Sequence, residues 1–247
     1  MFQLTDRDKI IIDKMAKRGW VSSKYLARFF PSHQAMTNRI HILRKNQIIE
    51  SKSIKDLIRD SNFNQASLNL TKYLSYTVFF YKIRDEWYKT FKKNYKKFSD
   101  PRLIIHQIYQ EYIEVYFLQE LGVENIESNP DLKPTPDLYF KHNNKKISVE
   151  IERTVKRNPN DLTVKKKNKD GTTNEYKRKS FSYDKHIDSL LDFSDIIIYL
   201  FETDKELEKF LKNTYSKRLY CSTINKVNEL INSSGNKILT KDLLNEQ

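Results

Sequence analysis

The fold of this chain is decided by one short stretch, Ile147-Ser148-Val149-Glu150-Ile151-Glu152. Aliphatic and polar residues alternate in it, and this period of two predicts a β-strand with both glutamates on one face. The residues before it, His142-Asn143-Asn144-Lys145-Lys146, are typical of a turn, so residues 137–140 are expected to pair back as the preceding strand. The hairpin would bring three carboxylates to one end of a small sheet: Asp137, Glu150 and Glu152.

Carboxylates this close together repel one another, and a divalent cation is the usual compensation. Oxygen ligands favour Mg²⁺ or Mn²⁺ over zinc. The chain has 45 Lys+Arg against 32 Asp+Glu, a net charge of +13, which favours a polyanionic partner. Nucleic acid is the first candidate partner and an anionic membrane surface the second. The alternative is that the positive charge reflects no partner, because basic surfaces are ordinary in a proteome rich in lysine and asparagine. These features together predict metal-assisted cleavage of a phosphodiester.

The single cysteine, Cys221, excludes a disulfide framework or a cysteine-based zinc site within one chain, and predicts a buried thiol in a reducing cytoplasm. Residues 1–8 contain no apolar segment typical of an export signal. The longest aliphatic run, 196–201, is too short to span a bilayer and predicts a buried strand. We therefore expect a cytoplasmic protein without membrane insertion, with one large domain or two small ones.

The N-terminal third predicts three short helices. Thr5 would cap the first and Gly19 end it, Ser22 or Ser23 would cap the second, and Ser32 the third. In the third helix Met36, Ile40 and Leu43 form the apolar stripe, and the polar or basic residues off it are Gln34, Thr37, Asn38, Arg39, His41, Arg44 and Lys45. With two expected strands at 48–51 and 66–71, this part resembles a winged-helix domain whose third helix enters the major groove. A helical cap used only for protein contacts is the alternative.

Three segments follow from this pattern: a winged-helix domain over 1–72, an aromatic-rich helical connector over 73–100, and a last domain over 101–247. The last domain begins with a helix to Gly122, on whose apolar face Glu111 lies with Ile108 and Val115. An inward carboxylate is costly unless it is paired or bound to metal. Glu111 at the edge of the stripe, reaching solvent or an arginine, is the alternative reading, and Glu114 is the fallback ligand. His106 is interpreted as a packed residue.

After the hairpin the sequence predicts a helix over 183–191, a strand over 195–201, a helix over 204–212, a strand over 218–221 and a helix from Thr223. This order predicts an α/β (α+β) core with a mixed sheet. It resembles the restriction-endonuclease-like PD-(D/E)xK fold. The resemblance implies that Asp137 is the metal-binding aspartate, Glu150 the second ligand and Glu111 the helix acid.

The usual lysine of this motif is replaced by Glu152, which would bind a second cation or orient the attacking water. The general base is therefore open, and Lys156 is the nearest lysine that could substitute. The segment 156–179 carries many further cations, among them Lys165, Lys166 and Lys167. It is expected to be either a solvated loop or a loop that clamps the DNA backbone.

A winged helix followed by a PD-(D/E)xK-like core is similar to the MOBC family of relaxases, and Val149-Glu150-Ile151-Glu152-Arg153-Thr154-Val155-Lys156 looks like the related replication-relaxation plasmid proteins. The resemblance implies metal-dependent nicking of double-stranded plasmid DNA at a transfer origin, with Mg²⁺ or Mn²⁺ as cofactor and a coupling protein as a further partner. Two alternatives stay open. One is a restriction or repair endonuclease of the same fold, and the other is a non-catalytic DNA-binding replication or relaxation accessory protein.

Overall fold

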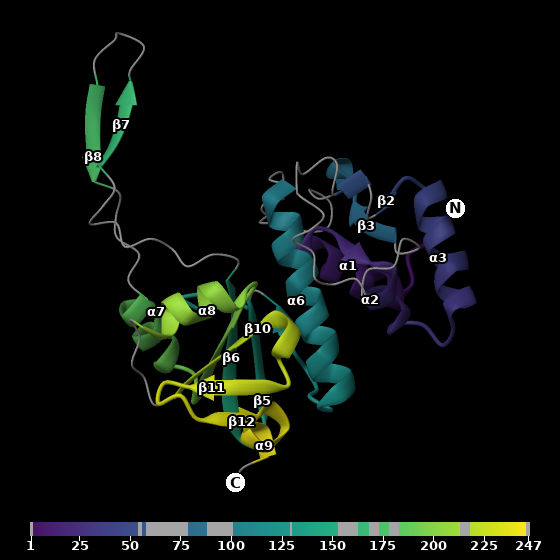
Figure 1. Ribbon diagram of the computed structural model, residues 1–247. Helices are drawn as coiled ribbons and strands as arrows, with labels where there is room; N and C mark the ends of the chain where they lie inside the picture. The colour runs from purple at the N-terminus through teal and green to yellow at the C-terminus, as the bar shows by residue number, and fades with distance from the viewer. Residues whose placement is uncertain are drawn as a thin grey trace. The chain divides into compact units, whose positions relative to one another are not determined.

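A computed structural model places the chain in two compact units, residues 1–129 and 130–247 (Figure 1). The structure describes residues 2–53, 56–57, 79–87, 101–128, 130–152, 163–167, 173–177, 183–212 and 218–245, and of 101–105, 163–167 and 173–177 it describes the backbone only. Both units contain helices and strands, so the predicted mixed α/β class is confirmed. The division at 129–130 differs from the predicted boundaries at 72 and 100.

The first helices of the chain begin at the predicted caps: α1 (Asp6–Arg18), α2 (Ser23–Ala27) and α3 (His33–Lys45). The hydroxyls of Thr5, Ser22 and Ser32 each accept a hydrogen bond from a backbone N–H in the first turn, which satisfies a donor that the helix leaves unpaired. Gly19 ends α1 with a φ of 85°, a conformation that favours glycine. The apolar stripe of α3 is buried as predicted: Met36, Ile40 and Leu43.

A small antiparallel sheet accompanies these helices, with strands β1 (Val21–Ser22), β2 (Ile49–Ser53) and β3 (Phe79–Ile83) in the order β1-β3-β2. Strand β2 confirms a strand near the first of the two predicted segments, 48–51, and the second, 66–71, lies outside the described residues. Strand β3 corrects the helical connector predicted over 73–100. Tyr81 pairs with Val21 on one side and Ser51 on the other, and the strand buries Phe80 and Ile83.

Helix α6 (Pro101–Glu120) and the short strand β4 (Glu127–Ser128) also belong to the first unit. The sequence predicted that this helix opens the last domain, whereas the division into two units places it in the first. Helix α6 contacts β1, and Val115 packs against the apolar core that α1, α2, α3 and the small sheet share. The helix therefore completes the first unit.

The second unit is built on a mixed sheet, as predicted, with strands β5 (Leu138–His142), β6 (Lys145–Glu152), β9 (Ile196–Phe201), β10 (Leu219–Thr223), β11 (Glu229–Asn232) and β12 (Lys237–Leu239). Neighbouring strands follow the order β12-β11-β10-β9-β6-β5. Strands β6, β9 and β10 are parallel, and β5, β11 and β12 run antiparallel to their neighbours. All six residues of β9 are buried, which matches its unbroken apolar sequence.

The hairpin between β5 and β6 turns at the predicted residues. Asn143 and Asn144 have φ values of 46° and 64°, the left-handed conformation that a two-residue hairpin turn requires and that asparagine tolerates. The register pairs Leu138 with Val149 and Phe140 with Ile147. The turn therefore sets which residues of β6 lie opposite the start of β5.

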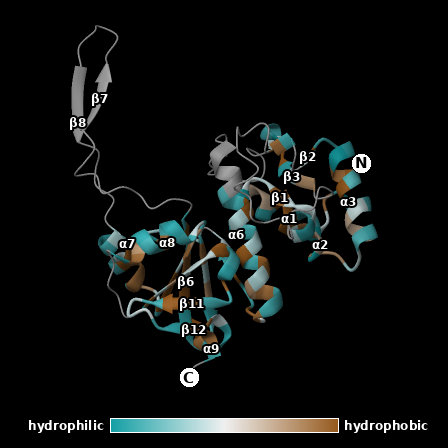
Figure 2. Cartoon of the chain, in the orientation of Figure 1, coloured by the Kyte–Doolittle hydropathy of each residue, from teal (hydrophilic) through white to brown (hydrophobic). Residues whose placement is uncertain are grey.

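One face of the sheet is covered by α7 (Tyr183–Leu191) and α8 (Asp204–Leu211), both at predicted positions. Ile187 and Leu190 of α7 and Phe210 of α8 pack on Tyr199 and Cys221 of the sheet. Hydrophobic residues gather on the strands, and α8 turns a hydrophilic side outward (Figure 2). Cys221 is buried, as predicted, and this burial raises the pKa of its thiol far above the usual range.

The helix predicted from Thr223 is wrong. A single 3-10 turn, η3 (Ile224–Lys226), is followed by β11, β12 and only then by α9 (Thr240–Asn245). The side chain of Asn232 accepts hydrogen bonds from the backbone N–H groups of Ser234 and Asn236, and Gly235 has a φ of 82°. These interactions make a hairpin turn where the prediction continued a helix.

The segment predicted as a basic loop contains an antiparallel pair of strands, β7 (Thr163–Lys167) and β8 (Thr173–Lys177). Lys165, Lys166 and Lys167 all lie in β7. None of the helices that the structure describes has the length and apolar composition needed to cross a membrane.

Candidate functional site

The predicted carboxylates of the second unit lie at the end of the β5–β6 pair that is remote from the turn. Asp137 directly precedes β5, and its Oδ2 accepts a hydrogen bond of 2.8 Å from the backbone N–H of Ile151. Ile151 stands between Glu150 and Glu152 on β6. The hydrogen bond therefore holds the Asp137 side chain beside the strand segment that carries both glutamates.

The predicted alternation along β6 is confirmed, but the polar face is not open to solvent. Ile147, Val149 and Ile151 are buried, and on the opposite face Glu150 is only 8% exposed. Helix α7 covers that face, where His186 Nε2 lies 3.3 Å from Glu150 Oε1. A buried carboxylate is costly without a partner, and the imidazole supplies one.

Tyr199 of β9 is the register partner of Glu150, so the two side chains emerge on the same face of neighbouring strands. Burial raises the pKa of Tyr199 well above its usual range, and the charges of Glu150 and Glu152 raise it further. Its hydroxyl is buried without a hydrogen-bond partner among the described residues. The ring of Tyr183 contacts the ring of Tyr199 edge-on, with centroids 6.0 Å apart. The carboxylates thus lie beside an aromatic, water-poor layer.

Glu152 is the last residue of β6 and is half-buried. Its backbone carbonyl accepts a hydrogen bond of 3.1 Å from the N–H of Glu202, which fixes the end of β6 against the end of β9. Lys156, the predicted substitute base, lies outside the described residues, and Lys165, Lys166 and Lys167 are described by their backbone only.

No three His, Cys, Asp or Glu side chains are grouped to hold a metal ion within the part of the chain that the structure describes. The predicted cluster of three carboxylates is therefore not seen there as a ready-made cage. Mg²⁺ rarely uses such a cage, because it keeps several waters and takes one or two carboxylates together with substrate phosphates. Asp137 and Glu150 fit that requirement.

Glu111, predicted as the helix acid of this site, is part of the first unit. Its two carboxylate oxygens accept hydrogen bonds from the backbone N–H of Ser22, at 2.8 Å, and from the Ser22 hydroxyl. Glu111 is only 2% exposed. These contacts give Glu111 a structural role at the start of α2, and its role as a metal ligand stays a prediction.

Glu114, the fallback ligand, is also buried in the first unit. Its carboxylate forms an ion pair with Arg18 and accepts hydrogen bonds from the hydroxyls of Tyr25, at 3.0 Å, and Ser128, at 2.9 Å. His106, on the same helix, is half-buried. The acids of α6 thus form a polar seam with α1, β1 and α2.

Replacing Glu111 with Ala is expected to lower the stability of the first unit by about 2–3 kcal/mol, because it leaves two buried donors of Ser22 unpaired. Both tryptophans, Trp20 and Trp87, lie in this unit, so urea unfolding followed by tryptophan fluorescence measures it directly. Glu120→Ala, at an exposed position of α6, is the matched control. A structural role is contradicted if Glu111→Ala unfolds at the same urea concentration as this control.

The third helix presents most of its predicted DNA-binding residues to solvent: Gln34, Thr37, Asn38, Arg44 and Lys45 are exposed. The amides of Gln34 and Asn38 bond each other, with Gln34 Nε2 2.8 Å from Asn38 Oδ1. No acidic residue occurs anywhere between Ser32 and Ile49. The exposed face of α3 is therefore polar and cationic.

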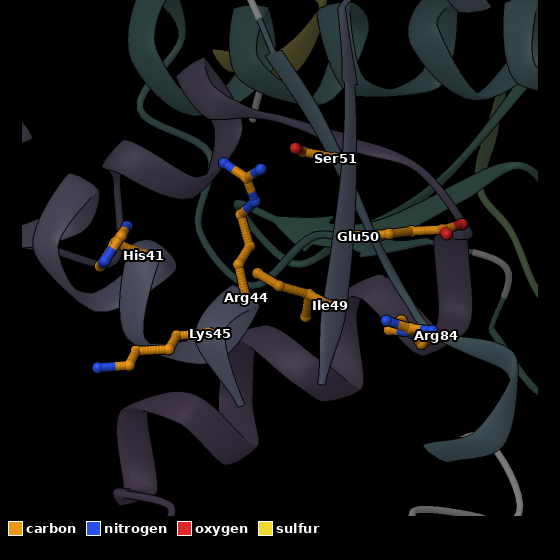
Figure 3. A pocket seen from close by; sticks show the side chains of 7 residues that line it. All are labelled: His41, Arg44, Lys45, Ile49, Glu50, Ser51 and Arg84. Atoms are coloured by element: carbon orange, nitrogen blue, oxygen red, sulfur yellow. The ribbon is translucent and has the colours of Figure 1, made fainter. Parts of the chain in front are cut away.

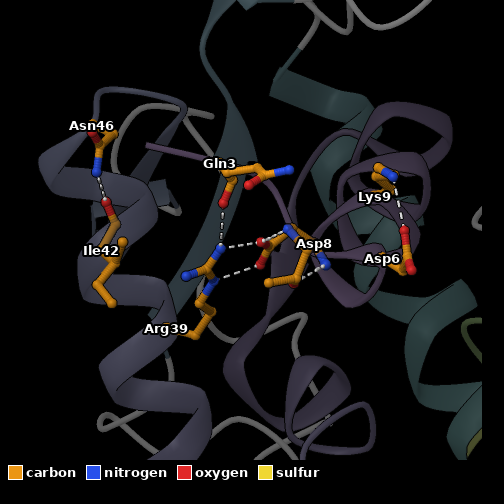
Figure 4. Close-up of polar contacts among 8 residues, drawn as sticks. Gln3, Asp6, Asp8, Lys9, Arg39, Ile42 and Asn46 are labelled. Atoms are coloured by element: carbon orange, nitrogen blue, oxygen red, sulfur yellow. Dashed lines mark hydrogen bonds and ion pairs between the residues drawn. The ribbon is translucent and has the colours of Figure 1, made fainter. Parts of the chain in front are cut away.

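Arg39, one of the polar residues of the helix predicted to enter the major groove, forms contacts within the protein (Figure 4). Its Nε donates to Asp8 Oδ1 at 2.8 Å and its Nη2 to Asp8 Oδ2, while Nη2 also lies 3.3 Å from the carbonyl of Gln3. Asp8 is completely buried. This bidentate ion pair holds α3 against the N-terminus of α1, and a contact of Arg39 with DNA stays a prediction.

A pocket of about 740 Å³ lies between the C-terminal half of α3 and strand β2 (Figure 3). Its lining residues are mostly cationic or polar: His41, Arg44, Lys45, Ile49, Glu50, Ser51 and Arg84. The carboxylate of Glu50 is 3.2 Å from Lys82 Nζ, so Glu50 forms an ion pair with a lysine that does not line the pocket. Arg84 Nε lies 3.3 Å from Glu86 Oε2, so Arg44 and Lys45 carry most of the positive charge of the lining.

Two residues of these surfaces were missed by sequence reasoning, His186 and Arg84. His186 lies in a helix that was predicted correctly, but nothing in its spacing indicates that it faces Glu150. Arg84 follows β3, the strand that was predicted as part of a helical connector.

No family model, no characterised protein and no solved structure matches this chain.

Proposed function

We propose that this chain is a metal-dependent DNA endonuclease that nicks plasmid DNA, as the resemblance to MOBC relaxases implies. The observation that carries the proposal is the hydrogen bond from Ile151 to Asp137, which sets one carboxylate beside the strand that bears two others. A mixed sheet with a parallel β6–β9–β10 centre and an antiparallel β5–β6 hairpin supports a restriction-endonuclease-like core. The helices α1, α2 and α3 with the small sheet support a winged-helix unit.

Asp137 and Glu150 would hold Mg²⁺ or Mn²⁺, with Glu152 beside them. A cation there would polarise the scissile phosphate and lower the pKa of a bound water. The chain itself supplies the placement: Ile151 orients Asp137, and His186 contacts Glu150 from α7. The buried aromatic layer around Tyr199 lowers the local dielectric, which strengthens the attraction between carboxylates and cation.

The exposed face of α3 would bind the DNA. Asn38 and Gln34 carry amides that can pair with the edge of adenine, and Arg44 and Lys45 would contact phosphates. The pocket between α3 and β2 adds Arg84 to these cations. Contacts to phosphates would hold the duplex in register, and contacts to bases would select the sequence. Both together would direct cleavage to one position.

The direct test is incubation of the full chain with a supercoiled plasmid that carries the DNA flanking its own coding sequence, with Mn²⁺, with Mg²⁺ and with EDTA. Metal-dependent conversion to the open circle is expected. Conversion to linear DNA would instead indicate a restriction or repair endonuclease. Binding of the plasmid without any cleavage in Mn²⁺ would favour the non-catalytic accessory protein, for which Glu152 in the place of a lysine is the specific support.

Replacing Arg44 and Lys45 together with Ala is expected to lower the affinity for DNA and to make that affinity less dependent on salt concentration. Each phosphate contact adds about 0.9 to the slope of log affinity against log salt concentration, so the double alanine variant should lose roughly 1.8. Fluorescence anisotropy of a labelled duplex at several salt concentrations measures this slope. Lys17→Ala, an exposed lysine of α1, is the control. An unchanged slope in the double variant would remove α3 from the DNA interface.

A further inference from the structure

Glu150 lies two residues before the end of β6, and one of its carboxylate oxygens contacts a histidine of α7. His186 Nε2 lies 3.3 Å from Glu150 Oε1, and the side chains are 19% and 11% exposed. An ionised carboxylate only accepts hydrogen bonds, so the imidazole nitrogen must be the donor. The contact thus restrains the rotation of the carboxylate, and with Glu150 ionised it requires a proton on His186 Nε2.

The position of His186 is itself fixed by packing. The next residue, Ile187, is buried in the core under α7, as is Leu190 one turn later. One turn before His186, Tyr183 contacts the rings of Tyr199 and Phe210, with centroids 6.0 and 4.9 Å away. Helix α7 is therefore held over the face of the sheet from which Glu150 emerges.

Tyr199 gives an independent reason why Glu150 needs a donor from the helix. Tyr199 is the cross-strand neighbour of Glu150, and its buried hydroxyl makes no hydrogen bond among the described residues. The neighbouring strand thus supplies no donor at this point in the described structure, while α7 does. The contact from α7 therefore bears directly on the orientation of Glu150.

We infer that His186 is the positioning residue of Glu150, holding that carboxylate in the orientation in which it binds a divalent cation. The inference rests on the proposed metal-dependent function. Partners that orient a ligating carboxylate typically contribute 10–100-fold, by order of magnitude, to metal affinity. His186 itself touches neither cation nor DNA in this role, and it acts through Glu150 alone.

The test measures Mn²⁺ binding to the full chain by the loss of the free-ion electron paramagnetic resonance signal, with plasmid nicking as the second readout. His186→Ala should raise the dissociation constant for Mn²⁺ by about 10–100-fold. His186→Gln, whose amide can donate to Glu150 from a similar distance, should recover most of this loss. His142→Ala, at the other end of β5, controls for unspecific binding of metal by histidine and should leave both readouts unchanged.

The outcomes separate the two proposals. If the wild-type chain neither binds Mn²⁺ nor nicks, the proposed function fails and the role of His186 fails with it. If the wild type binds Mn²⁺ and His186→Ala binds it equally well, only the role of His186 is overturned. If His186→Gln binds as weakly as His186→Ala in a folded protein, the hydrogen bond is not what positions Glu150, and the inference is again overturned.

Discussion

Replacing Asp137 with Asn is expected to reduce nicking of supercoiled DNA by roughly 100-fold or more, the effect typical of losing one preorganised electrostatic group. The Asn side chain keeps an oxygen that can accept the hydrogen bond from Ile151, so the β5–β6 pair stays intact. What is lost is the negative charge that would bind the cation. DNA affinity should stay within about twofold, because phosphate contacts dominate binding and the cations that make them are unchanged.

Glu150→Gln is the companion variant, because its amide oxygen can still accept the hydrogen bond from His186. Asp131→Asn removes an exposed carboxylate from the same unit and is the matched control. Open-circle formation on agarose gels and anisotropy of a labelled duplex provide the two measurements. Equal nicking by Asp137→Asn and Asp131→Asn would refute the assignment of the site.

Replacing Arg39 with Ala is expected to destabilise the first unit by roughly 2–4 kcal/mol at pH 7, because it leaves the buried carboxylate of Asp8 without its cationic partner. Asp8 is completely buried, and Arg39 is its two-pronged partner. Urea unfolding followed by the fluorescence of the tryptophans of this unit measures the loss. Arg44→Ala, an exposed arginine on the same helix, should change stability by less than about 0.5 kcal/mol. An equal loss in both variants would contradict the buried ion pair.

The same ion pair predicts a pH dependence. Burial raises the pKa of Asp8, but hydrogen bonds from Arg39 and Thr5 together outweigh it, so the pKa lies below its usual value in the folded protein. A lowered folded-state pKa stabilises the fold above the unfolded-state pKa of about 4 and loses that contribution as the pH falls through the folded value. The difference in stability between the wild type and Arg39→Ala should therefore narrow below about pH 4. A constant difference down to pH 3 would contradict the lowered pKa.

Local chemistry made much of the fold predictable. Thr5, Ser22 and Ser32 cap helices because their hydroxyls satisfy donors within the same turn, and Asn143-Asn144 turns because asparagine tolerates positive φ. The strand 196–201 was predicted because an unbroken apolar run of that length suits a buried parallel strand. Each of these signals lies within a few residues of the structure it specifies.

Two of the differences between prediction and structure have the opposite character, because each depends on a partner distant in sequence. The aromatic run around Phe79–Ile83 fits a helical period as well as a strand, and only its pairing with β1 and β2 decides between them. Helix α6 shares a unit with the N-terminal helices, and no local signal indicates this because Ser22, the partner of Glu111, lies 89 residues earlier. The helix expected from Thr223 failed for a local reason, since the turn signal at Asn232–Asn236 was overlooked.

The candidate site was predictable in part for the same reasons. Asp137, Glu150 and Glu152 follow from alternation and from a short turn, so their order along one hairpin could be expected. The ion pair of Arg39 with Asp8 could not be predicted, because the polar outer face of a helix does not show which of its side chains bond to a neighbouring helix. The contact of His186 with Glu150 could not be predicted either, because Glu150 lies on a strand 36 residues earlier.

The polar seam along α6 has a consequence for synthesis on the ribosome. Trp20, Ser22 and Arg18 find partners that lie 87, 89 and 110 residues later in the chain. At about 5–20 residues per second, on the order of 5–20 s pass between the emergence of Arg18 and that of Ser128. Throughout that interval the nascent N-terminal helices carry polar groups whose partners have not yet been translated. The first unit is thus completed only after Ser128 has been made, and a stalled chain that ends before Ser128 exposes an unfinished core to chaperones.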